Sequence, residues 1–219
     1  MWDLAFPPIC LGCRRLLREP SLPYLCAHCR PQQSWLPPEL AERGGVRAAW
    51  DYEGPLGRAL IALKFESQLA FAGPLGQLLA ADPRLTRLSD GGPVELLVPA
   101  PLHWRRRLSR GFDQAQLLAT WALRHARRRR SEGAKLPTLS PRLLVRSRAT
   151  AAQRTLDASA RASNVAGAFC VSRSHSARGR RILVLDDVTT TGATAQACMA
   201  ALAEAGAARV EALALLRRV

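Results

Sequence analysis

The segment 182–194 constrains the fold of this chain more than any other part of the sequence. It begins with an entirely apolar run, Ile182-Leu-Val-Leu185, which is typical of a strand in the middle of a parallel sheet. Two adjacent carboxylates follow, Asp186 and Asp187, and a threonine-rich loop then leads directly into an alanine-rich helix expected over about 193–205. This order of strand, loop and helix predicts an α/β fold.

The rest of the chain alternates strand-like and helix-like segments. Apolar patterning predicts strands at 46–52, 94–98, 142–145, 166–171 and 210–216. It predicts helices at 55–65, at 74–82, at 156–162 and from a capping Asp113 to about 127, with a loop over 128–140. We therefore expect a single α/β domain with a mostly parallel sheet, and the sequence contains no internal repeat.

Four cysteines near the start of the chain indicate a metal site. Cys10 and Cys13 form one C-x-x-C pair, and Cys26 and Cys29 form a second pair twelve residues later. Two such pairs direct four thiolates at one centre, which is the arrangement of structural Zn²⁺ sites. Disulfide bonds fit less well, because they are rare in cytosolic proteins. A thioredoxin-like redox motif fits less well because it has a single pair between a strand and a helix. We expect a zinc module over 1–40 and the α/β domain over 41–219.

The charge of the chain is concentrated in its second half. The 219 residues include 32 Lys and Arg against 17 Asp and Glu, a formal net charge of +15, and residues 1–99 are neutral overall. Such a basic half favours partners that carry phosphate, although a general bias toward arginine would give the same count. No apolar run approaches the ~20 residues of a membrane helix and no signal peptide is recognisable, so we expect a cytoplasmic protein without membrane insertion.

The loop after Asp187 has the features of a phosphate-binding loop. It offers hydroxyl groups, backbone N–H groups and the start of a helix, all of which favour a phosphate dianion. Its candidate phosphate-binding residues are Thr189, Thr190, Thr191, Gly192, Ala193 and Thr194. Carboxylates beside a phosphate are useful when they accept hydrogen bonds from sugar hydroxyls, so Asp186 and Asp187 are candidate ribose-binding residues. An acidic turn with hydroxyl caps is the alternative interpretation.

The same segment resembles the ribose-phosphate signature of type I phosphoribosyltransferases, with Thr189 standing where an aliphatic residue is usual. Other segments are similar to the ComF (ComFC-like) competence family: Leu63-Lys-Phe65, Val98-Pro-Ala-Pro-Leu-His103, Arg110-Gly-Phe-Asp-Gln-Ala115, and Gln153 followed by Arg161-Ala-Ser-Asn-Val-Ala-Gly-Ala-Phe169. Together with the cysteine pairs they cover nearly the whole chain. Asp113 replaces the asparagine that is more common in the family, which favours a helix cap at that position.

The resemblance implies a sheet of the type I phosphoribosyltransferase kind with a small N-terminal zinc-ribbon-like module. It implies binding of phosphoribosyl pyrophosphate or ribose 5-phosphate with Mg²⁺, and a glycosyltransferase reaction on an unknown acceptor. Lys64 becomes a possible active-site residue, although a solvated lysine at a helix end is an equally simple reading. The candidate pyrophosphate-binding residues are Pro99, Ala100, Pro101, Arg106, Arg107 and Arg110.

The resemblance also implies a role in natural transformation and DNA uptake. An alternative function is therefore a non-catalytic accessory protein that binds single-stranded DNA, works with a competence helicase and uses the phosphoribosyl site as a ligand sensor. The candidate nucleic-acid contacts form one basic run, Arg127, Arg128, Arg129 and Arg130. Aromatic residues make up only 5% of the chain, so the sequence shows no regular series of stacking rings.

Overall fold

A computed structural model describes residues 8–19, 23–102, 108, 111–129, 135–146, 167–172 and 175–219. A seven-stranded sheet forms its centre, with the strand order β1-β2-β9-β8-β4-β5 and with β3 paired to β9 beyond β2. The strands of this sheet are β1 (Glu42–Arg43), β2 (Val46–Arg47), β3 (Trp50–Asp51), β4 (Leu96–Pro99), β5 (Thr138–Leu139), β8 (Arg181–Thr189) and β9 (Arg209–Arg217). All pairs are parallel except β1 with β2. The predicted α/β class with a mostly parallel sheet is therefore confirmed.

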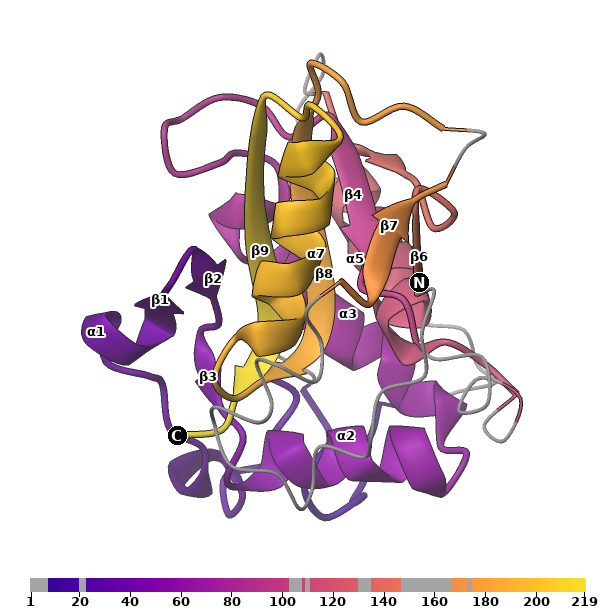
Figure 1. Ribbon diagram of the computed structural model, residues 1–219. Helices are drawn as coiled ribbons and strands as arrows, with labels where there is room; N and C mark the ends of the chain where they lie inside the picture. The colour runs from indigo at the N-terminus through magenta and orange to yellow at the C-terminus, as the bar shows by residue number, and fades with distance from the viewer. Residues whose placement is uncertain are drawn as a thin grey trace.

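Helices cover both faces of the sheet (Figure 1). On one face lie α2 (Pro55–Phe65), α3 (Ala72–Ala80) and α5 (Gln114–Arg129). On the other lies α7 (Ala193–Glu204), beside a separate antiparallel hairpin of β6 (Leu144–Arg146) and β7 (Phe169–Val171). The shorter helical segments are α1 (Pro38–Ala41), η1 (Arg30–Gln32), η2 (Leu69–Phe71) and η3 (Pro83–Leu85). Leu183, Leu185 and Leu213 pack under the first group, whereas Ile182 and Val184 pack under α7.

Helix α2 shows how the local sequence specifies an element. Gly54, at φ +106°, turns the chain into the helix, and Pro55 then stands at the first helical position, where its missing N–H costs nothing. Leu56, Leu60 and Leu63 are fully buried on one face, as their spacing predicts. The helix has the predicted bounds, 55–65.

The N-terminal segment packs into the same hydrophobic core as the sheet. Leu11, Leu17 and Leu25 are buried together with Leu56 and Leu63 of α2. The side chains of Tyr24 and Gln77 are hydrogen-bonded, as are those of Arg14 and Glu66. The cysteine-containing segment is therefore fixed against α2 and α3, although the boundary near residue 40 stays a prediction.

Some predicted elements differ from the structure. The strand expected at 46–52 is two short strands, β2 and β3, that pair in turn with β9. The loop expected over 128–140 is wrong at both ends, because α5 continues to Arg129 and β5 pairs with β4. Of the two cysteines outside the pairs, Cys198 of α7 is buried, whereas Cys170 of β7 is exposed. The helix expected at 156–162 lies outside the described residues. Of the described helices, none has both the length and the apolar character that crossing a membrane requires.

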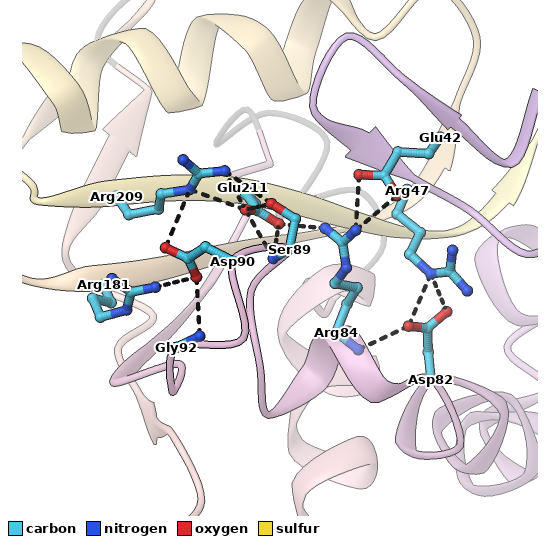
Figure 2. A network of polar contacts seen from close by, with 10 residues as sticks. All are labelled: Glu42, Arg47, Asp82, Arg84, Ser89, Asp90, Gly92, Arg181, Arg209 and Glu211. Carbon is cyan, nitrogen blue, oxygen red and sulfur yellow. Dashed lines mark hydrogen bonds and ion pairs between the residues drawn. The ribbon is translucent and has the colours of Figure 1, made fainter. Parts of the chain in front are cut away.

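A network of ion pairs joins the amino end of the sheet to the segment between α3 and β4 (Figure 2). At its centre is Glu211 of β9, which is 5% exposed and accepts hydrogen bonds from the backbone N–H of Ser89 at 3.0 Å and from Nε of Arg209 at 3.1 Å. Arg84 bridges Glu211 to Glu42, and Arg47 pairs with Asp82 at 2.8 Å. Arg181 and Arg209 also face Asp90. Arg47, Arg84, Arg181 and Arg209 therefore have acidic partners and do not form an open basic surface.

Candidate functional site

The loop between β8 and α7 lies at the carboxyl end of the central strand, where ligands of open α/β sheets bind. Gly192 caps α7 with φ +84°, a left-handed conformation in which a side chain would be strained. The hydroxyl of Thr191 accepts a hydrogen bond from the backbone N–H of Ala193 at 3.4 Å. Thr190 and Thr194 are partly exposed, so three of the predicted phosphate-binding hydroxyls lie near the surface, whereas Thr189 is only 4% exposed.

Asp186 and Asp187 have different surroundings although they are adjacent. Asp186 is partly buried on the α7 side, and its Oδ1 accepts the backbone N–H of Asp187 at 2.8 Å. Burial, together with the charge of Asp187, raises the pKa of Asp186 to about 7. Burial and the nearby Asp186 also raise the pKa of the Cys198 thiol. The first carboxylate is therefore poised to exchange a proton near neutral pH.

Asp187 faces the opposite side of the sheet, where Lys64 of α2 reaches it. The Lys64 Nζ lies 2.9 Å from Oδ2 of Asp187, and both side chains are largely buried, with 15% and 7% exposed. The two side chains form a largely buried ion pair, in which the ammonium group offsets the cost of burying the carboxylate. The sequence identified Lys64 only through the family resemblance, and the structure brings it into contact with the predicted ribose-binding pair.

Asp113 joins two parts of the site. Its Oδ1 accepts the backbone N–H of Gln116 at 3.1 Å, so the predicted helix cap is confirmed. Its Oδ2 accepts the backbone N–H of Leu102 at 3.2 Å, which ties the segment after β4 to the start of α5. Burial raises the pKa of Asp113, and the charge of Asp187 raises it further. The capping residue thus also fixes the position of the 99–102 segment.

The predicted pyrophosphate loop lies beside the end of β8. Pro99 is in register with Leu185, and the backbone N–H of Ala100 donates to the carbonyl of Leu185 at 2.8 Å. A cavity of about 310 Å³ opens next to Pro99 and Pro101. Its other lining residues include Leu102, Asp113, Gln116, Arg142, Arg146 and Ser172. The loop and the two carboxylates therefore share one edge of the sheet.

Sequence reasoning missed two arginines at this cavity, Arg142 and Arg146. They come from the segment that follows β5 and from β6, and only the pairing of β5 with β4 brings them near Pro99. The guanidinium of Arg146 also lies over the ring of Phe169, 5.3 Å from its centroid. The predicted residues Arg106, Arg107, Arg110 and Arg130 lie outside the described residues. Arg127, Arg128 and Arg129 are exposed on the last turn of α5.

The four predicted cysteine ligands converge. The Sγ atoms of Cys10, Cys13, Cys26 and Cys29 all lie within 4.8 Å of one another, and those of Cys13 and Cys26 are 3.7 Å apart. A tetrahedral Zn²⁺ with Zn–S bonds of ~2.3 Å needs sulfurs about 3.8 Å apart, so the donor set and its spacing fit this ion. The backbone N–H of Cys29 and other hydrogen bonds lower the pKa of Cys26 to about 6, whereas burial and the neighbouring cysteines raise the pKa of Cys29 to about 12. Four adjacent sulfurs thus oppose one another's ionisation unless a cation binds them.

Gly12 shows how closely this cluster is packed against the α/β domain. A Cβ atom at that position would lie 2.8 Å from Sγ of Cys29 and 2.9 Å from Cβ of Pro55, at the start of α2. Any larger residue would therefore push the cluster away from α2, the helix that carries Lys64.

Comparisons with known proteins agree with these features. Residues 121–219, which include β8, the threonine loop and α7, match the phosphoribosyl transferase domain. The chain is 27% identical over 218 residues to "Competence protein F" of Haemophilus influenzae, an alignment that covers 95% of this chain and 90% of that protein. It is 34% identical over 121 residues to "DNA utilization protein YhgH" of Escherichia coli K12, which covers 55% of this chain and 48% of that protein. The YhgH protein of E. coli O6:H1 matches at the same identity and length.

Proposed function

We propose that this chain, which carries a phosphoribosyltransferase domain and is a relative of competence protein F, binds phosphoribosyl pyrophosphate with Mg²⁺. In this proposal it transfers the ribose to an unidentified nitrogen nucleophile. The observation that carries the proposal is the shared edge of β4 and β8. There the Pro99–Pro101 segment lies next to Asp186, Asp187 and the start of α7. A single sugar that carries both a phosphate and a diphosphate can contact all of these groups at once.

In this proposal each part of the site binds a different group of the ligand. The 5′-phosphate binds the threonine loop, where hydroxyls, backbone N–H groups and the α7 dipole meet. Asp187, which forms an ion pair with Lys64, accepts hydrogen bonds from a ribose hydroxyl. The diphosphate lies in the cavity beside Pro99 and Pro101, and Arg142 and Arg146 neutralise its charge.

The residues present fit Mg²⁺ as an ion held mainly by the ligand. Carboxylate oxygens are suitable Mg²⁺ donors, and this ion commonly combines one or two of them with substrate phosphates and water. Asp186 and Asp187 are the carboxylates best placed for this at the sheet edge. When bound, Mg²⁺ neutralises the negative charge of the departing pyrophosphate. The four cysteines, in contrast, leave no open coordination position, so we assign them to a structural Zn²⁺.

Ligand binding and pyrophosphate release together test this proposal. Titration calorimetry with phosphoribosyl pyrophosphate and Mg²⁺ should give binding for the wild type and for the control Glu204→Gln, an exposed carboxylate on α7. Asp187→Asn should bind at least ten times more weakly, because it loses a charged hydrogen-bond acceptor. Slow pyrophosphate release by the wild type, and none by the variant, would support catalysis. A wild-type protein that fails to bind this compound would refute the proposal.

The alternative function, binding of single-stranded DNA, is favoured by an aromatic surface away from the sheet edge. Trp35 is 65% exposed and stacks on Trp50 with ring centroids 3.6 Å apart. The two rings line a cavity of about 530 Å³, which Arg30 and the ion pair of Arg47 with Asp82 also border. The exposed ring of Trp35, in a cavity that Arg30 also lines, suits stacking of an unpaired base. The names of the relatives refer to competence and DNA utilization, and a helicase-type partner would supply such a strand.

DNA binding has its own test. The affinity of a fluorescent oligothymidylate should fall steeply between 50 and 200 mM salt, because Lys and Arg contacts release counterions. Trp35→Ala should weaken binding by about 1–3 kcal/mol at every salt concentration, which is the usual contribution of one stacked base. Substituting Trp121, which packs beside α3, is the control for a general loss of tryptophan. A flat salt response would exclude the basic residues as the contact.

A further inference from the structure

Arg217, at the end of β9, is a buried arginine whose charge has no acidic partner in the described part of the chain. It is 3% exposed. One terminal nitrogen donates to the carbonyl of Val46 at 2.7 Å, and its buried Nε has no hydrogen-bond partner among the described residues. Burial and the neighbouring Arg43 both lower the pKa of Arg217. Buried charges in proteins are normally paired, so an unpaired guanidinium requires an explanation.

The position of Arg217 next to the predicted phosphate loop suggests an explanation for its unpaired charge. It is in register with Thr189, and the backbone N–H of Arg218 donates to the Thr189 carbonyl at 2.9 Å. Paired residues of a parallel ladder project from the same face of the sheet. The hydroxyl of Thr189 is likewise buried without a hydrogen-bond partner among the described residues. Two unsatisfied polar groups thus stand side by side where the predicted phosphate loop begins.

The guanidinium end of the side chain also lies near the loop. Its acceptor, Val46, contacts Gly192, because a Cβ atom built on that glycine would lie 3.5 Å from Cγ2 of Val46. Gly192 is the capping residue of α7. Arg217 is therefore in register with the first residue of the Thr189–Gly192 segment, and its side chain binds Val46, which lies beside the last. Its positive charge adds to that of the helix N-terminus at the same place.

We propose that Arg217 is a phosphate-recognition residue, whose fixed charge behind the loop stabilises the dianion of a sugar phosphomonoester. The inference rests on the proposed function, since the ligand is the 5′-phosphate of the phosphoribosyl group. The phosphate supplies the negative charge that the described residues do not offer to Arg217. Thr189, unusual for this motif, adds a second buried polar group that has no hydrogen-bond partner among the described residues at the start of the loop.

The test is calorimetric titration of ribose 5-phosphate at pH 7.5 into the wild type and three variants. Arg217→Met keeps much of the side-chain volume and removes the charge, and it should weaken binding about tenfold or more, as expected for a lost bond to a charged group. Arg217→Lys keeps the charge and should stay within about threefold of the wild type. Arg218→Met is the matched control, since Arg218 is the next residue but is exposed and faces Glu53 and Tyr52. It should bind like the wild type.

The outcomes separate the two proposals. Binding by Arg217→Met within twofold of the wild type would overturn the role of Arg217 and leave the proposed function standing. An equal loss in Arg217→Lys and Arg217→Met would also overturn it, because the bond to Val46 rather than the charge would then be what matters. If Arg217→Met does not fold, Arg217→Lys decides: a loss of tenfold or more would overturn the role of the charge, and binding within about threefold of the wild type would support it. A wild type that does not bind ribose 5-phosphate would refute the proposed function and this inference together.

Discussion

Replacing Asp186 by asparagine should stabilise the folded protein while it removes ligand binding. The carboxylate of Asp186 lies partly buried beside Asp187, and its pKa rises to about 7 from an ordinary value of 3.8 because ionisation is opposed there. Between these two pKa values the folded chain holds a proton that the unfolded chain has released. Stability contributed by this group therefore falls as the pH rises from about 4 to about 7.

The size of the effect follows from the shift. One pKa unit corresponds to about 1.4 kcal/mol, so a carboxylate shifted by about three units loses roughly 2.5 kcal/mol of stability between pH 5 and pH 8. Asparagine does not titrate, and its side-chain oxygen can still accept the backbone N–H of Asp187. We expect the variant to gain on the order of 2 kcal/mol over the wild type on going from pH 5 to pH 8.

Urea unfolding at pH 5, 6, 7 and 8 measures this difference directly. The wild-type free energy of unfolding should fall relative to that of Asp186→Asn, with most of the change complete near pH 7. Glu204→Gln, an exposed carboxylate on the same helix that follows the loop, should track the wild type at every pH. A constant difference between wild type and Asp186→Asn across this range would refute the reasoning, because it would show that burial does not oppose ionisation of Asp186.

Three further predictions concern groups that support the site. Lys64→Met should lower the free energy of unfolding by about 3 kcal/mol, because Asp187 is left buried without its cation; urea unfolding at pH 7.5 measures this, and a loss under 1 kcal/mol would contradict it. Chelation of a Zn²⁺ held by the four cysteines should lower the melting temperature, and added Zn²⁺ should restore it; less than about half a zinc per purified chain would overturn the assignment. Glu211→Gln should cost about 1–3 kcal/mol, because Arg84 and Arg209 lose their shared carboxylate, and unfolding equal to the Glu204→Gln control would contradict this.

The elements that the sequence predicted well are those whose patterning is local. The central strand through Asp186, observed as β8 to Thr189, the helix from Ala193 and the helix 55–65 each contain their own apolar pattern. The edge strands were less predictable, since β2, β3 and β5 have only two residues each and exist because they pair with β9 or β4. Short strands of this kind depend on tertiary contacts rather than on propensity.

The same distinction applies to the candidate site. The Asp186–Asp187 pair and the threonine loop lie in one stretch of sequence, so their chemistry could be inferred without a structure. The pairing of Lys64 with Asp187 could not, because it depends on where α2 packs. Arg142 and Arg217 also have no local motif, and only the register of the sheet places them near the ligand loops.

The packing of the cysteine module gives it a role in the site without any direct contact to a ligand. Gly12 lies close to both Cys29 and Pro55, the first residue of α2, and Lys64 lies in the last turn of the same helix. A helix of eleven residues is nearly rigid, so a displacement at Pro55 is carried to Lys64 rather than absorbed between them. Since Lys64 lies 2.9 Å from Asp187, order in the cysteine module and the geometry of the ion pair at the predicted ribose-binding carboxylate are linked through α2. This connection gives a structural reason for joining a small metal module to a phosphoribosyltransferase domain in one chain.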